Sequence, residues 1–375
     1  MVIVAGGMVV IVAMVGLVID SGYAWSQRRS VQNAADMASM AGARVVGLHT
    51  QSGSAAGPAD SDVQGAVEDV LAENGRSTTP CSVSVTEDCY TARYVDEAGV
   101  VIPGALVGGG SLPSAARGVQ VEPTSQVDTF FMGVLGFSEV TTSAPATARV
   151  SGAANVGGPG DNLLPIAVVL DDELWNDHFC APDQAASECT ELHLDTEVEP
   201  GSGHNGLPGQ FGWLSWDGSN SVPPLRDWIG PPANSPVYEV PHNDYIEIEG
   251  VPGSKETLRD NIRDWAALET TVIIPIVSPG PPDAGEDCNS QPDRCYPGTN
   301  TPYPESGGGT GSNAWYNIIG FAGFEITGCA SGGGPNGCVR NIYGVFRQVL
   351  FNGPTGSTSG SASSPWQILA TQLVD

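Results

Sequence analysis

Positive charge is the scarcest property of this sequence. Its 375 residues contain 14 lysines and arginines against 42 aspartates and glutamates, which leaves a formal net charge of −28, and Lys255 is its single lysine. So acidic a surface repels phosphate backbones, and we therefore expect no nucleic acid among the partners of this protein.

Motifs of enzyme active sites are also missing. The sequence has no Gly-x-Ser-x-Gly elbow, no His-Glu-x-x-His pair and no phosphate-binding loop, and its five histidines are scattered. We therefore expect no catalytic residues, no enzyme activity and no cofactor. A membrane-anchored hydrolase stays open as an alternative, which a Ser/His/Asp cluster or a pair of glutamates in a pocket would favour.

Charge is absent altogether from residues 1–19, which read MVIVAGGMVVIVAMVGLVI. As a helix rising about 1.5 Å per residue, they would span about 28 Å, close to the hydrocarbon core of a bilayer. A cleaved signal peptide, the alternative, has an apolar stretch of only about 7–15 residues before its cleavage site. The run predicts a transmembrane segment at residues 1–19 that continues as a helix through residues 20–48, with the membrane as a partner.

The residues after this run carry a distinctive motif, DSGYAWSQRRSVQNAADMASMAGAR. It resembles the N-terminal signature of the TadE/TadG-like proteins of tight-adherence (Flp) pilus assembly: an apolar helix, an Asp-x-Gly-aromatic step and a Gln-Asn-Ala-Ala-Asp run. Val31 departs from that pattern, because leucine is usual there, and no charged segment precedes the apolar run. The matching residues are Asp20, Gly22, Gln32, Asn33, Ala34, Ala35, Asp36, Ala38 and Ala41.

This resemblance implies a pilus component whose C-terminal region is external. Stretches around Val119, residues 129–137 and Ala146 also resemble the family, and the resemblance continues more loosely beyond Asp161.

Small residues recur on one side of the predicted helix. Their spacings of three, four and seven place them on neighbouring stripes of the helix surface. Such stripes let a second helix approach closely, so we expect contact here with a pilin subunit, an assembly protein or another copy. Alanine as a mere helix former is the alternative, and Ala38→Leu, expected to block association without disturbing the fold, would separate the two. The set is Ala34, Ala35, Ala38, Ser39, Ala41 and Gly42.

The eight cysteines form four close pairs, and each pair brackets a polar segment. Proximity predicts four local disulfides, which are typical of an oxidising compartment. The pairs are Cys81/Cys89, Cys180/Cys189, Cys288/Cys295 and Cys329/Cys338.

Zinc is an alternative for one of these pairs. His178 and Cys180, followed by Cys189 and His193, supply four residues of the types that bind zinc. No Cys-x-x-Cys knuckle accompanies them, so we favour the disulfide.

The orientation signals conflict. Arg28 and Arg29 follow the apolar run, which by the positive-inside rule would leave the C-terminal region in the cytoplasm. The paired cysteines favour the opposite side. We give the cysteines more weight and expect a single-pass cell-membrane protein whose C-terminal region is extracellular.

A second metal hypothesis concerns Asp217, Ser219 and Ser221, which match the Asp-x-Ser-x-Ser motif of von Willebrand A domains. That motif needs a helix directly after it so that its oxygens converge on a cation. Because Pro223 and Pro224 follow at once, we interpret the match as coincidence and expect no metal. An anchored adhesin or metal-dependent ligand-binding module is the alternative that a cation here would favour.

The remaining sequence predicts an α+β fold: a long N-terminal membrane-anchored helix, a small α+β unit and a larger β-rich mixed domain. We place a Gly/Ser/Ala/Pro linker at residues 49–60, the small domain at 61–154, a second linker at 155–162 and the C-terminal domain at 163–375. Within the small domain we expect a helix opened by a capping box of Ser61 and Gln64, and a two-turn helix at residues 128–137.

Overall fold

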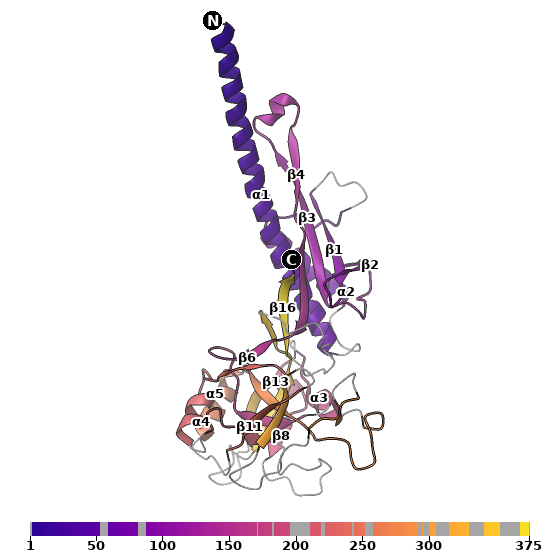
Figure 1. Cartoon of the computed structure of the whole chain (residues 1–375), viewed down its shortest axis with the longest axis vertical. Helices are drawn as coiled ribbons and strands as arrows, with labels where there is room; N and C mark the ends of the chain where they lie inside the picture. The colour runs from indigo at the N-terminus through magenta and orange to yellow at the C-terminus, as the bar shows by residue number, and fades with distance from the viewer. Residues whose placement is uncertain are drawn as a thin grey trace. The chain divides into compact units, whose positions relative to one another are not determined.

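The computed structural model describes residues 2–52, 59–81, 88–170, 172–181, 184–195, 211–218, 222–241, 244–251, 258–291, 294–295, 300–304, 315–329, 341–352 and 368–374 (Figure 1). The chain forms two compact units, Met1–Ser151 with Thr371–Asp375 and Gly152–Ala370. An N-terminal helix followed by a β-rich mixed body confirms the α+β class. The boundary after Ser151 lies just before the predicted second linker.

The first unit begins with α1 (Val2–Ser52), a helix of 51 residues that no proline interrupts. Its second half is a core element of the unit. Ala34, Ala38 and Val46 are fully buried in one cluster with residues of a second helix and of the sheet. The predicted first linker therefore begins too early, because helical structure continues to Ser52.

The second helix, α2 (Asp60–Glu73), buries an apolar stripe of Val63, Val67 and Leu71. Its start differs from the prediction. The backbone N–H of Ala59 donates a 2.6 Å hydrogen bond to the Asp62 carboxylate, so Asp62 rather than Gln64 satisfies the helix entrance. Asp62 accepts a hydrogen bond from the start of the helix, as the predicted Gln64 would have done two residues later. Both residues lie in the same short polar stretch, so the sequence alone did not distinguish between them.

The sheet of this unit is built around β3 (Gly118–Asp128). Along one side β3 pairs antiparallel with β1 (Cys89–Val95), which pairs in turn with β2 (Val101–Leu106). Along the other side its first residues pair with β5 (Ala146–Gly152) and its last residues with β4 (Glu139–Ser143). The order is β16-β5-β3-β1-β2, where β16 is Leu369–Val374.

The β3–β4 hairpin extends past the end of β1, since β1 pairs with β3 only as far as Thr124. Figure 1 shows this hairpin running alongside α1 toward the N-terminal part of the helix. The predicted two-turn helix at residues 128–137 was wrong. Strand β3 continues to Asp128, and the loop contains only η1 (Met132–Leu135), a single 3-10 turn. Two glycines within it, Gly133 and Gly136, favour a turn over a helix.

The second unit contains a sheet in the order β8-β14-β13-β12-β7-β9, with β11 paired to β13. Among the described strands of this sheet, β12 and β7 pair in parallel and the other pairs are antiparallel. The strands are β7 (Ile166–Val169), β8 (Leu192–Asp195), β9 (Phe211–Trp213), β11 (Ile246–Glu249), β12 (Thr271–Val277), β13 (Trp315–Cys329) and β14 (Asn341–Arg347). The strand that follows in the chain, β15 (Leu350–Asn352), does not belong to this sheet.

Both faces of this sheet are covered. Along β12, Ile274 and Ile276 belong to one buried cluster and Ile273 and Val277 to another, as alternation in a strand requires. That is why the strand reads as a continuous apolar run in the sequence. The helices are α3 (Asp172–His178), η2 (Ala186–Glu188), α4 (Val222–Ile229) and α5 (Arg259–Leu268).

One predicted linker contains regular structure. Within residues 155–162, β6 (Asn155–Gly157) pairs antiparallel with β10 (Val237–Glu239), so this segment belongs to the second unit. Its glycines suggested a linker, but Gly157 adopts a positive φ of 95° where an added Cβ would collide with the Pro236 carbonyl. The glycine therefore permits close pairing.

Candidate functional site

The first charged residue after the apolar run, Asp20, joins α1 to the β3–β4 loop. Its carboxylate accepts hydrogen bonds from the backbone N–H groups of Phe130, Phe131 and Met132 at 2.9, 2.9 and 2.7 Å. The side chain is only 4% exposed although it lies in the middle of a long helix. One carboxylate thus satisfies three amides that the turn into η1 leaves without backbone partners.

Two effects oppose each other at this carboxyl. Burial by itself raises the pKa of Asp20, whereas the hydrogen bonds from Met132, Phe131 and Phe130 lower it, and the pKa ends below its ordinary value. The charged form is therefore the one that the loop binds.

Apolar contacts reinforce the same junction. A Cβ atom placed on Gly16 would lie 2.6 Å from the Cβ of Phe131, so the Phe131 side chain packs directly onto the helix backbone there. One turn beyond Asp20, the rings of Tyr23 and Phe130 meet edge to face with centroids 5.5 Å apart. Gly16, Asp20 and Tyr23 lie at spacings of four and three, which places them on one face of α1.

The loop is also braced from within. The Thr129 hydroxyl donates to the Phe137 carbonyl, and the Thr129 N–H donates to the Ser138 carbonyl at 2.9 Å. The N–H of Phe137 donates to the Met132 carbonyl at 3.1 Å. The junction is therefore a defined structure that can hold the loop at a fixed height along α1.

The helix side of this junction, with Gly16, Asp20 and Tyr23, lies inside the region that matches a known family. Residues 1–45 match the family model Tad, Flp pilus-assembly TadE/G-like. The N-terminal resemblance is confirmed over those residues. No curated protein and no solved structure matches the chain. The looser resemblance expected beyond residue 45 has no support from these comparisons and stays a prediction.

The TadE/G-like motif residues occupy different environments. Asp20 is buried at the junction, while Gly22 is exposed and has nothing within 4 Å of the position of an added Cβ. The Gln32 amide donates to the Asp36 carboxylate at 2.8 Å and to the Pro145 carbonyl at 3.4 Å. Asn33 is exposed. Contacts within the chain therefore account for Asp20, Gln32 and Asp36, and they do not account for Gly22 or Asn33.

The stripe of small residues faces the interior of the unit. Ala34, Ala35, Ala38 and Ser39 are 0% exposed, Gly42 is buried and Ala41 is half-buried. A Cβ on Gly42 would lie 2.9 Å from Val67 in α2 and 3.2 Å from Val119 in β3. Close approach is thus achieved, but to elements of the same chain. Use of this stripe by a partner helix stays a prediction, and it would require α2 and β3 to move aside.

Three of the four predicted disulfides are formed: Cys81–Cys89, Cys180–Cys189 and Cys288–Cys295, with Cα atoms 4.9, 5.6 and 5.7 Å apart. Cys329 is also disulfide-bonded, and its predicted partner Cys338 lies outside the described residues.

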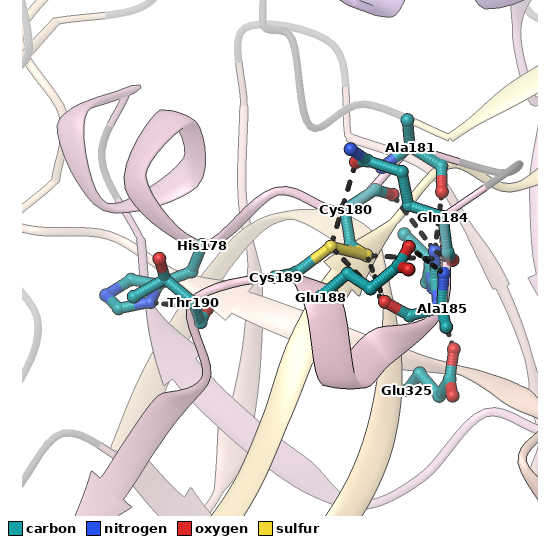
Figure 2. The surroundings of a disulfide bond; sticks show 10 residues. His178, Cys180, Ala181, Gln184, Ala185, Glu188, Cys189, Thr190 and Glu325 are labelled. Carbon is teal, nitrogen blue, oxygen red and sulfur yellow. Dashed lines mark hydrogen bonds and ion pairs between the residues drawn. A yellow bond between two sulfur atoms is a disulfide. The ribbon is translucent and has the colours of Figure 1, made fainter.

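The zinc alternative was wrong, because Cys180 and Cys189 bond to each other. Figure 2 shows His178 directed away from the sulfur atoms and toward Thr190, whose carbonyl lies 3.0 Å from His178 Nδ1.

The described part of the chain holds no group of three or more histidine, cysteine, aspartate or glutamate side chains placed to bind a metal. Of the Asp-x-Ser-x-Ser match, Asp217 is described, with the Ser215 hydroxyl 3.4 Å away, while Ser219 and Ser221 lie outside the described residues. The expectation that Pro223 and Pro224 exclude a helix after the motif was wrong, because α4 begins at Val222, directly before them. Proline is well accepted in the first helical turn.

A hollow in the second unit bears on the hydrolase alternative. It has a volume of about 380 Å³, and Glu286, Asp287 and Asn289 line it together with prolines. The Asp287 carboxylate is occupied by the loop itself. Hydrogen bonds from the Ser290 and Asn289 amides and side chains hold its pKa below the ordinary value. These hydrogen bonds stabilise the turn at Asp287.

No described helical stretch is both long and apolar enough to cross a membrane.

Sequence reasoning missed the loop at residues 129–138 as part of the site. The signal was present: TFFMGVLGFS is a run of ten uncharged residues between Asp128 and Glu139 in a strongly acidic chain. Nothing in the sequence, however, shows that this run and Asp20 meet, because more than a hundred residues separate them.

Proposed function

We propose that this protein is a non-enzymatic, membrane-anchored extracellular component of a tight-adherence pilus system, either an assembly factor or a minor pilin-like subunit. The observation that carries the proposal is the TadE/G-like match at residues 1–45, which includes Asp20, whose carboxylate joins α1 to the β3–β4 loop. The family favours a role in assembly over catalysis.

Two further features support the anchor and its orientation. Residues 1–19 carry no charge over about 28 Å of helix, although the side chains of residues 1–13 are not among those described. All three described disulfides lie on the C-terminal side of α1, which suits an oxidising exterior.

Partners are proposed to contact the face of α1 that the unit leaves open. Gly22, Asn33 and Met37 are exposed, and their spacings of eleven and four place them on one side of the helix. Two of them belong to the family motif without an internal contact that explains them. Asn33→Arg is expected to reduce co-purification of pilus proteins while leaving expression normal. Unchanged co-purification and normal pilus numbers would remove this face from the proposal.

Fractionation of the native host tests the central claim. The protein is expected in the membrane fraction after carbonate extraction, and in sheared filaments as well if it is a subunit rather than an assembly factor. Two results together would contradict the proposal: complete release of the protein by carbonate from wild-type membranes, and normal pili in a strain from which its gene is deleted.

A further inference from the structure

The apolar loop that Asp20 holds has aromatic side chains open to the surroundings. Phe130 is 66% exposed, Phe137 60% and Phe131 43%, within a loop that carries no charge from Thr129 to Ser138. Large phenylalanines on a loop tip are unusual in a soluble domain and mark an interaction site.

The height of this loop along α1 identifies what it meets. Phe131 packs against Gly16, which lies within the uncharged run and about 6 Å along the helix from Asp20 toward the N-terminus. The helix at that level is itself apolar and open: Leu17 is 54% and Val18 70% exposed. If residues 1–19 cross the bilayer, this loop cannot remain in water.

We propose that the β3–β4 loop, residues 129–138, inserts into the outer interface of the lipid bilayer beside α1 as a second membrane contact. The inference rests on the proposed anchor. We identify lipid as the partner of the loop for two reasons. The loop continues the apolar surface of residues 1–19 at the same level along α1, and charged residues resume only at Asp128 and Glu139.

The hydrogen bonding of the loop suits that environment. Unpaired backbone amides are costly near hydrocarbon. Asp20 accepts from three of them, and carbonyls within the loop region accept from Thr129, Gly136 and Phe137. With Asp20 at the headgroup boundary, the contact between Phe131 and Gly16 lies about 6 Å deeper along α1. Interfacial segments are buried to a similar depth of about 5–10 Å.

Aromatic and cationic groups on α1 fit the water side of the same interface. Trp25 is 63% exposed, and the Arg29 guanidinium lies over its ring at 5.4 Å. Tryptophan and arginine are typical of headgroup level. The junction therefore fixes the body of the first unit at a set distance from the membrane through two contacts instead of one flexible helix.

Site-specific photo-crosslinking tests the inference in the full-length chain. The protein, reconstituted in vesicles of phosphatidylethanolamine and phosphatidylglycerol, carries p-benzoylphenylalanine in place of Phe137, Val18 or Val100. Val100 is the matched control: it is also 60% exposed, in the same unit, and it lies near the Val95–Gly118 pair at the opposite end of β3 from the loop. A circular dichroism spectrum like that of the wild type verifies that each variant is folded.

We expect lipid adducts at Phe137 comparable in yield with those at Val18, and well above those at Val100. Adducts at Val18 without adducts at Phe137, or adducts from Phe137 to protein alone, would overturn the loop insertion and leave the anchor standing. Equal labelling at Phe137 and Val100 would also overturn it. Absence of lipid adducts at Val18 would refute the anchor, and the inference with it.

Discussion

At the scale of single residues, Asp20 matters most because its carboxylate holds the β3–β4 loop against α1. Asp20→Asn removes the charge and replaces one acceptor oxygen with an N–H donor that opposes the amides of Phe130, Phe131 and Met132. We expect faster hydrogen exchange at these three amides while the amides of β1 are unchanged. Asp128→Asn, an exposed carboxylate near the same loop, is the control. Equal exchange in both variants would show that Asp20 does not hold the loop.

The same carboxyl sets a pH dependence. Because the pKa of Asp20 is lowered in the folded protein, despite the opposing effect of burial, its stabilisation is complete above the ordinary aspartate value of about 4 and is lost as pH falls through the lowered folded value. The difference between wild type and Asp20→Asn should therefore be constant at neutral pH and shrink in acid. Loop amide chemical shifts measured by NMR follow it, and a difference that grows in acid would contradict the assignment.

Two glycines of α1 make a matched pair. An added Cβ meets Val67 and Val119 at Gly42 but meets nothing at Gly22. Gly42→Ala should therefore destabilise the first unit by about 1–2 kcal/mol through overpacking, whereas Gly22→Ala should stabilise the helix by up to about 1 kcal/mol. Hydrogen exchange of β3 in denaturant measures both. Equal effects would mean that α1 does not pack on α2 and β3 as described.

The same reasoning changes the expectation for Ala38→Leu. The sequence alone predicted a variant that folds normally and blocks association. In the structure Ala38 is 0% exposed in the core of the first unit, so leucine there disturbs the fold directly. The variant no longer separates partner binding from folding, and exposed Asn33 is the better position for that purpose.

At the scale of elements, Arg347 on β14 holds the disulfide loop of the second unit. Its guanidinium pairs with Glu325 on β13 at 2.7 Å and donates to the carbonyls of Ala181 and Gln184 at 2.6 and 3.0 Å. Both charged side chains are nearly buried, at 10% and 12% exposure. Figure 2 shows Glu325 near the loop that the Cys180–Cys189 bond closes.

Arg347→Met should cost the second unit about 3–5 kcal/mol, because it leaves Glu325 buried without its partner. Of the eight tryptophans only Trp25 lies in the sequence of the first unit, and the other seven lie within residues 152–370. Intrinsic fluorescence during denaturation therefore reports mainly on the second unit. The double variant Arg347→Met with Glu325→Leu should recover much of the loss. No recovery would indicate that the carbonyl contacts of Arg347, and not its charge pair, carry the effect.

Elements with a long apolar run or an apolar stripe can be recognised from the sequence, and those defined by distant contacts cannot. The runs that became β12, β13 and β14 are apolar enough to be recognised alone, and α2 shows its stripe directly. The loop around η1 was misjudged because its apolar residues have no local core to pack against. Their positions depend on Asp20, which is remote in sequence.

At the scale of the whole molecule, the sequence indicated an anchor followed by separate domains, whereas the second half of α1 belongs to the core of the first unit. The difference has a physical origin. An alanine-rich sequence predicts a helix, but it does not indicate which other element of the chain will pack against that helix. The N-terminal helix and the first unit are consequently one mechanical element, and a force on either is transmitted to the other.

The proposed extracellular location of that element can be tested through its sulfur chemistry. Described disulfides occur in both units, Cys81–Cys89 in the first and two others in the second, and no described cysteine is free. For loops this short each bond contributes about 2–3 kcal/mol, so both units reach full stability only where these bonds can form. Alkylation of intact native cells with membrane-permeant N-ethylmaleimide should leave all eight cysteines unmodified until a reductant is added. Labelling without reductant would place the body in the cytoplasm and would make Arg28 and Arg29, rather than the cysteines, the true guide to orientation.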